Sequence, residues 1–437
     1  MKLGKRIIIG AGCFVLLLVS WLIVVNTKSD AEKQKALMEQ AAALMNDGIF
    51  IRAVPLLEEA AGFSTENTAE VEDELKKAYL ALIDTVGFRR KYTTLLETQM
   101  NRTGTHPDIF AEAANYYLSI LKTTQALAIL RTGIEMTGDE HLISLYEQNR
   151  YVYEQNRAVY DNVTAINGST IQVQNEGLWG LAGSDGNLII PCQYDKISTF
   201  SSDRAIVKKG NEIYAVNPDN NRLAILREAA SDFGNFANDR IALLIDNAWW
   251  RATGEFIIGT ASFDQLGMYS EGYIPAKIDG KWGVIDLSNN WLIPAEYDGI
   301  VQDELGRCYA QGAVFAWSSG MVYLFIGGHQ IGDAYEDARP FSSEGYAAVK
   351  KGGKWGFIDP AGTLMINYCF DDALSFGQHL AAVKQEELWG YISISGKIVI
   401  EPLFAEAKSF SNGSAPVLTE RGWQFITLLE YKKGATL

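Results

Sequence analysis

Three patterns of apolar and polar positions follow one another along the chain. Residues 7–25 form an apolar run without a charge, and from about residue 30 to 160 apolar residues recur at three- and four-residue steps. From about residue 165 apolar and polar residues alternate. These patterns are typical of a membrane span, amphipathic helices and strands, respectively. The sequence therefore predicts a multi-domain α + all-β protein, divided at 1–28, 29–160 and 165–437.

The first pattern predicts a transmembrane anchor. As a helix this run would span roughly 28 Å, close to the thickness of the bilayer hydrocarbon. Lys2, Lys5 and Arg6 precede it, which favours a cytoplasmic N-terminus with the rest of the chain outside the cytoplasm. A cleaved signal peptide is the rival interpretation, but its apolar region would be shorter and would end in small residues. We expect a single-pass cell-membrane protein.

The second pattern predicts helices in pairs, separated by glycine-containing stops. Leu57, Leu96 and Leu130 occupy matching places in the second helix of each pair. Their spacing is close to the period of roughly 34 residues that defines tetratricopeptide repeats, and the paired helices resemble that family. The predicted pairs are 31–46 with 50–61, 69–86 with 89–101, and 108–121 with 124–136.

A further helix is predicted after these pairs. Tyr146, Tyr153 and Tyr160 are spaced by sevens, which returns to nearly the same face of a helix. We expect this helix to cap the helical domain and to lead into the β domain.

The third pattern contains a repeat marked by Trp-Gly pairs, with a period of roughly 34 residues, in the range of repeat architectures. The last three tryptophans of the series are evenly spaced, and two longer gaps contain degenerate copies, one of them near residues 315–317. Each unit reads as three or four short strands. The predicted structural positions are Trp179, Tyr214, Trp249, Trp282, Trp355, Trp389 and Trp423, with the glycines Gly180, Gly283, Gly356 and Gly390.

The residue types of the repeat suit a stacked β structure. The tryptophan buries a large apolar surface, and the glycine beside it lets another backbone approach closely. An Asp follows the recurrent Tyr or Phe at Asp298 and Asp371 and can accept hydrogen bonds from turn amides. Asp372 follows at once, so an acid/base pair of carboxylates is the competing interpretation. Turn capping explains the recurrence better.

Residues 281–286, 354–359 and 341–349 carry the resemblance of this region to the WG-repeat family, which extends over nearly all of 165–437. That resemblance implies β-rich repeats joined to other modules, no general enzymatic activity and a role in binding. Seven or eight such units predict a closed β-propeller, with an open β-superhelix as the alternative. Residues 169–173 and 423–429 resemble the two parts of one blade, whose joining would close the ring.

Composition excludes some functions. With 38 Lys and Arg against 53 Asp and Glu, the net charge is -15, which argues against nucleic-acid binding. The sequence contains no C-x-x-C motif among its cysteines, Cys13, Cys192, Cys308 and Cys369. We therefore expect free thiols, with a single disulfide as the alternative. The histidines show no metal-ligand spacing, and no catalytic or nucleotide-binding motif occurs. We expect no cofactor and no metal.

Three functions follow as hypotheses. The first is a membrane-anchored, extracytoplasmic protein-interaction scaffold with no catalytic activity, whose partners are unidentified proteins. The alternative is a cell-wall or glycan binder that uses aromatic side chains of the β domain, with Trp250, Trp291 and Trp317 free for a surface role. An enzyme with clustered carboxylates is the third and least favoured. The sequence names no ligand-binding residue.

Overall fold

A computed structural model describes residues 29–102, 106–226 and 230–431. They form two compact units that divide between Tyr146 and Glu147. Among these described residues, no helix is both long enough and apolar enough to cross a bilayer. The predicted anchor at residues 7–25 lies outside them and stays a prediction.

The first unit consists of helices in antiparallel pairs, as the sequence predicted. Gln34 near the start of one helix donates to the carbonyl of Ala60 near the end of its partner, at 3.0 Å. The assignment to tetratricopeptide repeats stays a prediction. The helices are α2 (Asp30–Asn46), α3 (Phe50–Ala61), α4 (Thr68–Ala81), α5 (Phe88–Met100), α6 (Pro107–Ser119), α7 (Thr123–Thr137) and α8 (Glu140–Asn149).

Local sequence signals set the ends of these helices. Ser29 and Glu32 form a reciprocal capping box that starts α2. Pro107 begins α6, where its missing N–H costs no hydrogen bond. Gly138 ends α7 in the left-handed conformation. The second pair differs from the prediction: α4 stops at Ala81, and residues 82–87 form turns.

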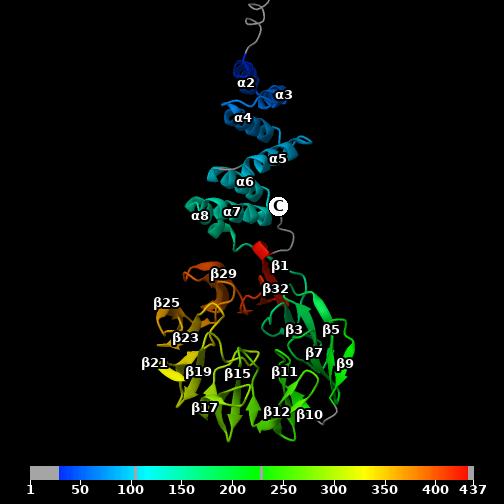
Figure 1. Ribbon diagram of the computed structural model, residues 1–437, viewed down its shortest axis with the longest axis vertical. Helices are drawn as coiled ribbons and strands as arrows, with labels where there is room; N and C mark the ends of the chain where they lie inside the picture. Colours follow the sequence, from blue (N-terminus) through cyan, green and yellow to red (C-terminus); the bar gives the residue numbers. More distant parts are fainter. Residues whose placement is uncertain (1–28, 103–105, 227–229, 432–437) are drawn as a thin grey trace, which may run out of the picture. The chain divides into compact units, whose positions relative to one another are not determined.

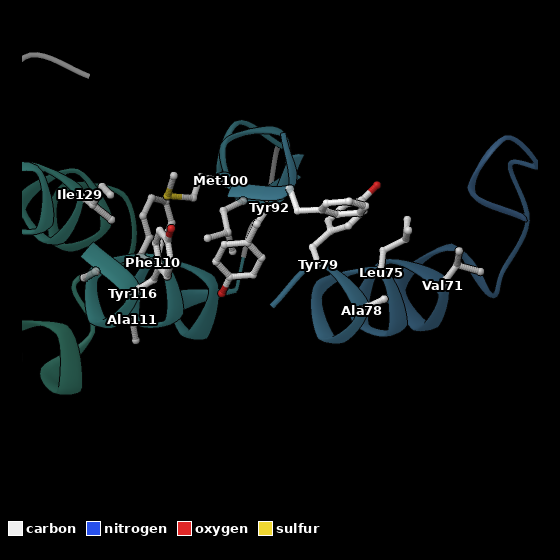
Figure 2. Packing of buried hydrophobic residues seen from close by; sticks show 14 of the residues in the cluster. Val71, Leu75, Ala78, Tyr79, Tyr92, Met100, Phe110, Ala111, Tyr116 and Ile129 are labelled. Atoms are coloured by element: carbon white, nitrogen blue, oxygen red, sulfur yellow. The ribbon is translucent and has the colours of Figure 1, made fainter. Parts of the chain in front are cut away.

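One apolar core runs through the helical unit. Tyr92 of α5 packs edge-on against Tyr116 of α6, with ring centroids 4.8 Å apart (Figure 2). Phe110 and Leu127 are almost fully buried. Aromatic and aliphatic contacts of this kind between consecutive pairs make the unit continuous rather than a row of separate hairpins.

The second unit is a ring of eight four-stranded antiparallel sheets, which we call blades 1 to 8 (Figure 1). The first strands of the blades are short. They are β2 (Asn162–Val163), β6 (Lys196–Ile197), β10 (Ala230–Phe233), β14 (Gln265–Leu266), β18 (Gly299–Ile300), β22 (Asp337–Ala338), β26 (Asp372–Ala373) and β30 (Glu406–Ala407).

The second and third strands form the central hairpin of each blade. The second strands are β3 (Thr170–Asn175), β7 (Ala205–Lys209), β11 (Arg240–Ile245), β15 (Tyr273–Ile278), β19 (Ala313–Ser318), β23 (Ala347–Lys351), β27 (Leu380–Gln385) and β31 (Ser414–Thr419). The third strands are β4 (Leu178–Gly183), β8 (Glu212–Val216), β12 (Ala248–Thr253), β16 (Lys281–Asp286), β20 (Met321–Ile326), β24 (Lys354–Ile358), β28 (Leu388–Ser393) and β32 (Gly422–Leu428).

The fourth strands complete the blades, and in Figure 1 those labelled β5, β9, β21 and β25 lie at the periphery of the ring. Their alternating exposed and buried residues fit a rim position. They are β5 (Leu188–Tyr194), β9 (Arg222–Ile225), β13 (Ile258–Phe263), β17 (Trp291–Tyr297), β21 (His329–Tyr335), β25 (Leu364–Phe370), β29 (Ile398–Phe404) and β1 (Tyr153–Gln155).

The ring closes in blade 8, where β1 pairs with β32. Closure by strands from both ends of the domain was predicted, and the superhelix is excluded. The predicted closing strand at residues 169–173 was wrong, however, because that segment mostly forms β3 in blade 1. The helix predicted through Tyr146, Tyr153 and Tyr160 was also wrong beyond Asn149. Pairing with the open edge of β32 outweighs the helical pattern there, and the β unit starts before residue 165.

Candidate functional site

The repeat tryptophans belong to the core of the propeller. They stand second in the third strand and lie opposite an aromatic residue, as Trp355 does opposite Phe370 of the fourth strand and Trp423 does opposite Tyr160. The same pairing recurs for Trp282 with Tyr297 and for Trp389 with Phe404. Trp355, Trp389 and Trp423 are buried, whereas Trp179, Trp249 and Trp282 are partly buried.

The glycine after the tryptophan is required by the next strand. A Cβ at Gly390 would lie 2.5 Å from the carbonyl oxygen of Ile400 and 2.7 Å from the nitrogen of Pro402. The β28–β29 pairing is irregular at this point. A Cβ at Gly180, Gly283 or Gly356 would lie 2.5, 2.4 or 2.6 Å from the equivalent carbonyl oxygen. The Trp-Gly pair is thus a packing device, as its residue types indicated.

Two of the predicted repeat positions were misassigned. Ile213 pairs with Lys208 as Trp355 pairs with Lys350, so Ile213, not Tyr214, takes the place of the tryptophan. In blade 5 that place belongs to Val322, which lies opposite Tyr335, and residues 315–317 belong to the preceding strand. The long segment between β18 and β19 extends blade 5, and this shifted the register that the spacing predicted.

The recurrent carboxylates join neighbouring blades. Asp298 accepts from the amide of Ser319 in the hairpin turn of blade 5, at 2.9 Å, and pairs with Lys281 of blade 4, at 2.8 Å. Asp371 makes the same two contacts, with Glu386 and with Lys354. Turn capping is therefore what the structure shows for both. Asp372 instead accepts from the amide of Ala373 and pairs with Arg339.

These contacts set the charge of the carboxylates. The hydrogen bond from Lys354 is the main cause that lowers the pKa of Asp371, and Lys281 lowers the pKa of Asp298 in the same way. A depressed pKa in the folded state means that the contact stabilises the fold above the ordinary pKa of an aspartate. The stabilisation is lost as the pH falls toward the folded-state value.

We therefore expect Asp371→Asn to lower the melting temperature at neutral pH, and the difference from the wild type to shrink below about pH 4. Thermal unfolding between about pH 3 and pH 7 measures this. Asp219→Asn is the control, because Asp219 is exposed and has no ion pair or side-chain hydrogen bond within the described part of the chain. A difference that stays constant with pH would contradict the interpretation.

The remaining candidate residues are dispersed. Trp250, Trp291 and Trp317 lie on three different blades, and of these Trp291 is the most exposed, at 39%. Cys192, Cys308 and Cys369 are free thiols, while Cys13 lies outside the described residues. No three His, Cys, Asp or Glu side chains in the described ranges gather as a metal site would need.

A loop in blade 5 closes the middle of the propeller. This plug loop, residues 303–307, lies between β18 and β19. The carbonyl of Leu305 accepts from Asn235 of blade 3 at 2.9 Å, and Glu304 pairs with Lys408 of blade 8. Blade 5 is not next to blade 3 or blade 8 in the ring. A loop of blade 5 that contacts both of them must therefore cross the axis of the ring. Leu305 is 2% exposed, which leaves the axis closed at this level.

The helical unit contains a groove that a ligand could enter. It lies between α2 and α4 and has a volume of about 920 Å³. Its apolar lining consists of Met38, Ala42, Met45, Phe50 and Ala81. Its charged lining consists of Lys35, Glu39, Glu70, Glu74 and Lys77. Flexible methionines beside charged side chains suit a partner segment with apolar anchors. Sequence reasoning named none of these residues, because a groove depends on how two helices pack.

The eight closed sheets define a β-propeller built from Trp-Gly repeats. Six segments match the family described as "WG containing repeat", at residues 179–212, 252–282, 282–302, 334–355, 355–389 and 389–423. The chain thus carries WG repeats, as the sequence indicated. No curated protein matches the chain.

Solved structures are only distantly similar to this chain. A eukaryotic initiation factor is 11% identical with a TM-score of 0.41, over 58% of this chain and 79% of that one. Hsv2 of Kluyveromyces lactis is 11% identical with a TM-score of 0.33, over 52% of this chain and 97% of that one. YCF48 bound to D1 peptide is 11% identical with a TM-score of 0.33, over 61% of this chain and 99% of that one. The fold assignment rests on the eight sheets themselves.

Proposed function

We propose that this protein is a membrane-anchored, extracytoplasmic scaffold that binds other proteins and has no catalytic activity. The observation that carries the proposal is the α2–α4 groove, which is lined by apolar and charged side chains and has room for a peptide segment. The anchor at residues 7–25 and the orientation of the chain are parts of the same proposal, supported by the sequence pattern alone.

The propeller supports a scaffold in a different way. Its tryptophans and recurrent carboxylates are used in packing and in joining blades, and its axis is closed by the plug loop. These groups are therefore committed to the fold. We propose that the propeller acts as a rigid body and that partner recognition begins at the helical groove.

The groove can be tested with two neighbouring alanines on α2. Both are exposed, but Ala42 lines the groove and Ala43 does not. Ala42→Arg should fill the groove and reduce partner capture about tenfold or more, because a charged side chain would displace the apolar anchors of the partner. Ala43→Arg adds the same charge one position further along the helix and should leave capture unchanged.

The measurement is capture of proteins from envelope fractions by the full chain in detergent, read by mass spectrometry. Proteins enriched by the wild type and by Ala43→Arg, but lost with Ala42→Arg, would support the groove. Equal capture by both variants would overturn it. Enrichment of wall polymer in place of protein, competed by free sugar, would favour the glycan-binding alternative and Trp291 as its first residue to test.

A further inference from the structure

Exposed aliphatic side chains recur at one kind of turn in the helical unit. The turns that join the two helices of each pair carry Ile49 in the first pair, Val86 in the second and Leu121 in the third, and Ile51 follows in the first turn of α3. Val86 is 97% exposed and Leu121 is 89% exposed. Large aliphatic residues at such exposure gain nothing from the core of this unit. We call these three turns, with the first residues of the helices that follow them, the turn edge.

Leu121 also has a strained backbone conformation. It has a φ of +59°, in the left-handed region that glycine adopts most readily. The amides of residues 121 and 122 bond back to Leu118 and Tyr117. The corresponding turn of the first pair makes the same two bonds with Gly48, at a φ of +76°. A glycine would therefore serve the fold better at position 121, so folding does not explain this leucine.

Basic residues accompany the aliphatic ones. Arg52, Arg90 and Lys122 are exposed, and within the described residues none of the three has an acidic partner. They lie at the N-terminal ends of the second helices: Arg52 and Arg90 in the first turns of α3 and α5, and Lys122 as the N-cap residue of α7. The first turns of these helices contain no acidic residue. A cation at this end of a helix opposes the helix dipole, so helix stability does not explain them either.

The turn edge is locally basic in a chain whose net charge is -15. Arg89 adds a fourth basic residue and lies 3.9 Å from Asp84. Asp47 is the other acidic residue of these turns. Beside Val86 a hollow of about 470 Å³ lies against α5 and is lined by Arg90 and Thr94. The edge thus combines exposed aliphatic groups with an excess of positive charge.

The three turns lie on the same edge because the pairs repeat in the same orientation. In the first two pairs, contacts between the start of one helix and the end of the other show antiparallel packing, as for Glu72 with Arg102. Figure 1 shows the turns after α4 and α6 on one side of the helical stack. A partner on that side can therefore contact the turns of successive pairs.

We infer that the turn edge is a membrane-contact surface, which places its aliphatic side chains among lipid chains and its basic side chains at anionic headgroups. Charge complementarity favours the bilayer as the occupant. The proposed anchor ends at residue 25, only a few positions before α2 begins, and such a tether would make even a weak contact effective. The inference goes beyond the scaffold function and does not depend on partner capture.

The test is hydrogen exchange of the full chain in nanodiscs of phosphatidylcholine alone or with about a third phosphatidylglycerol. We expect residues 47–53, 83–91 and 119–124 to exchange about tenfold more slowly in the anionic discs. The turns at 62–67 and 137–139, on the opposite edge, should not change. A chain that does not enter nanodiscs can be compared with vesicles of the same two compositions. Equal exchange in both lipids would overturn the inference.

Two variants separate membrane contact from stability. Leu121→Gly should keep or raise the thermal unfolding midpoint, since glycine accepts the positive φ, yet it should weaken the protection of residues 119–124. Replacing Arg52, Arg90 and Lys122 by Gln should remove the difference between the two lipid compositions. If Leu121→Gly leaves the lipid-dependent protection intact, the leucine does not contact the membrane and the proposed surface is wrong.

Discussion

Gly390→Ala is expected to destabilise the propeller by about 3 kcal/mol, at the upper end of the cost of overpacking a core. The added Cβ would lie 2.5 to 2.8 Å from three backbone atoms of residues 400–402. Backbone cannot rotate away as a side chain can, so β28 and β29 would have to separate. Chemical denaturation of the purified protein, followed by tryptophan fluorescence, measures the change.

Gly234→Ala is the matched control for this prediction. A Cβ at Gly234 would meet the side chain of Ala242 at 3.4 Å, an ordinary contact, and the position has no positive φ. We expect a change within about half a kcal/mol there. Equal losses at Gly390 and Gly234 would show that the motif glycine is not fixed by its neighbouring strand.

Trp355→Ala is the second large effect, with an expected loss of about 3–5 kcal/mol. Trp355 is 2% exposed, lies opposite Phe370, and carries the Arg339 guanidinium 4.4 Å from its ring centroid. Removing the ring leaves a cavity between two strands and the guanidinium without its aromatic contact. Equilibrium unfolding in denaturant gives the free energy directly.

Trp291→Ala serves as the comparison, because Trp291 is 39% exposed and lies at the start of a fourth strand. Its loss should cost about 1 kcal/mol. If Trp355→Ala were as mild as Trp291→Ala, the repeat tryptophans would not be the core of the blades, and a binding role for them would have to be considered again.

The sequence allowed the repeat to be found because packing imposes it residue by residue. The Trp-Gly pair, the aromatic of the following strand and the capping Asp each report a contact within a blade or with its neighbour. Their spacing predicted seven or eight units, and the sheets show eight. Ile213 and Val322 escaped detection because an aliphatic residue can occupy the tryptophan position without the rest of the signature.

What could not be predicted depends on contacts between distant segments. The short strand β1 carries little strand signal by itself, and its conformation is set by β32, at the other end of the β unit. The plug loop is visible in the sequence only as extra length in blade 5. The α2–α4 groove is likewise a product of helix packing, since its lining residues are ordinary on each helix alone.

The closing strand has a mechanical consequence. The chain leaves the helical unit and enters the propeller directly at β1, so any tension between the two units acts first on the strand that completes the ring. The first contacts to bear it are the bond from the Leu429 amide to the Val152 carbonyl, the contact of Arg150 with Glu430 and the three paired residues of β1, and further bonds to β32 follow at Asn156 and Tyr160. Force on this connection would open the ring at its seam before it strained any other blade.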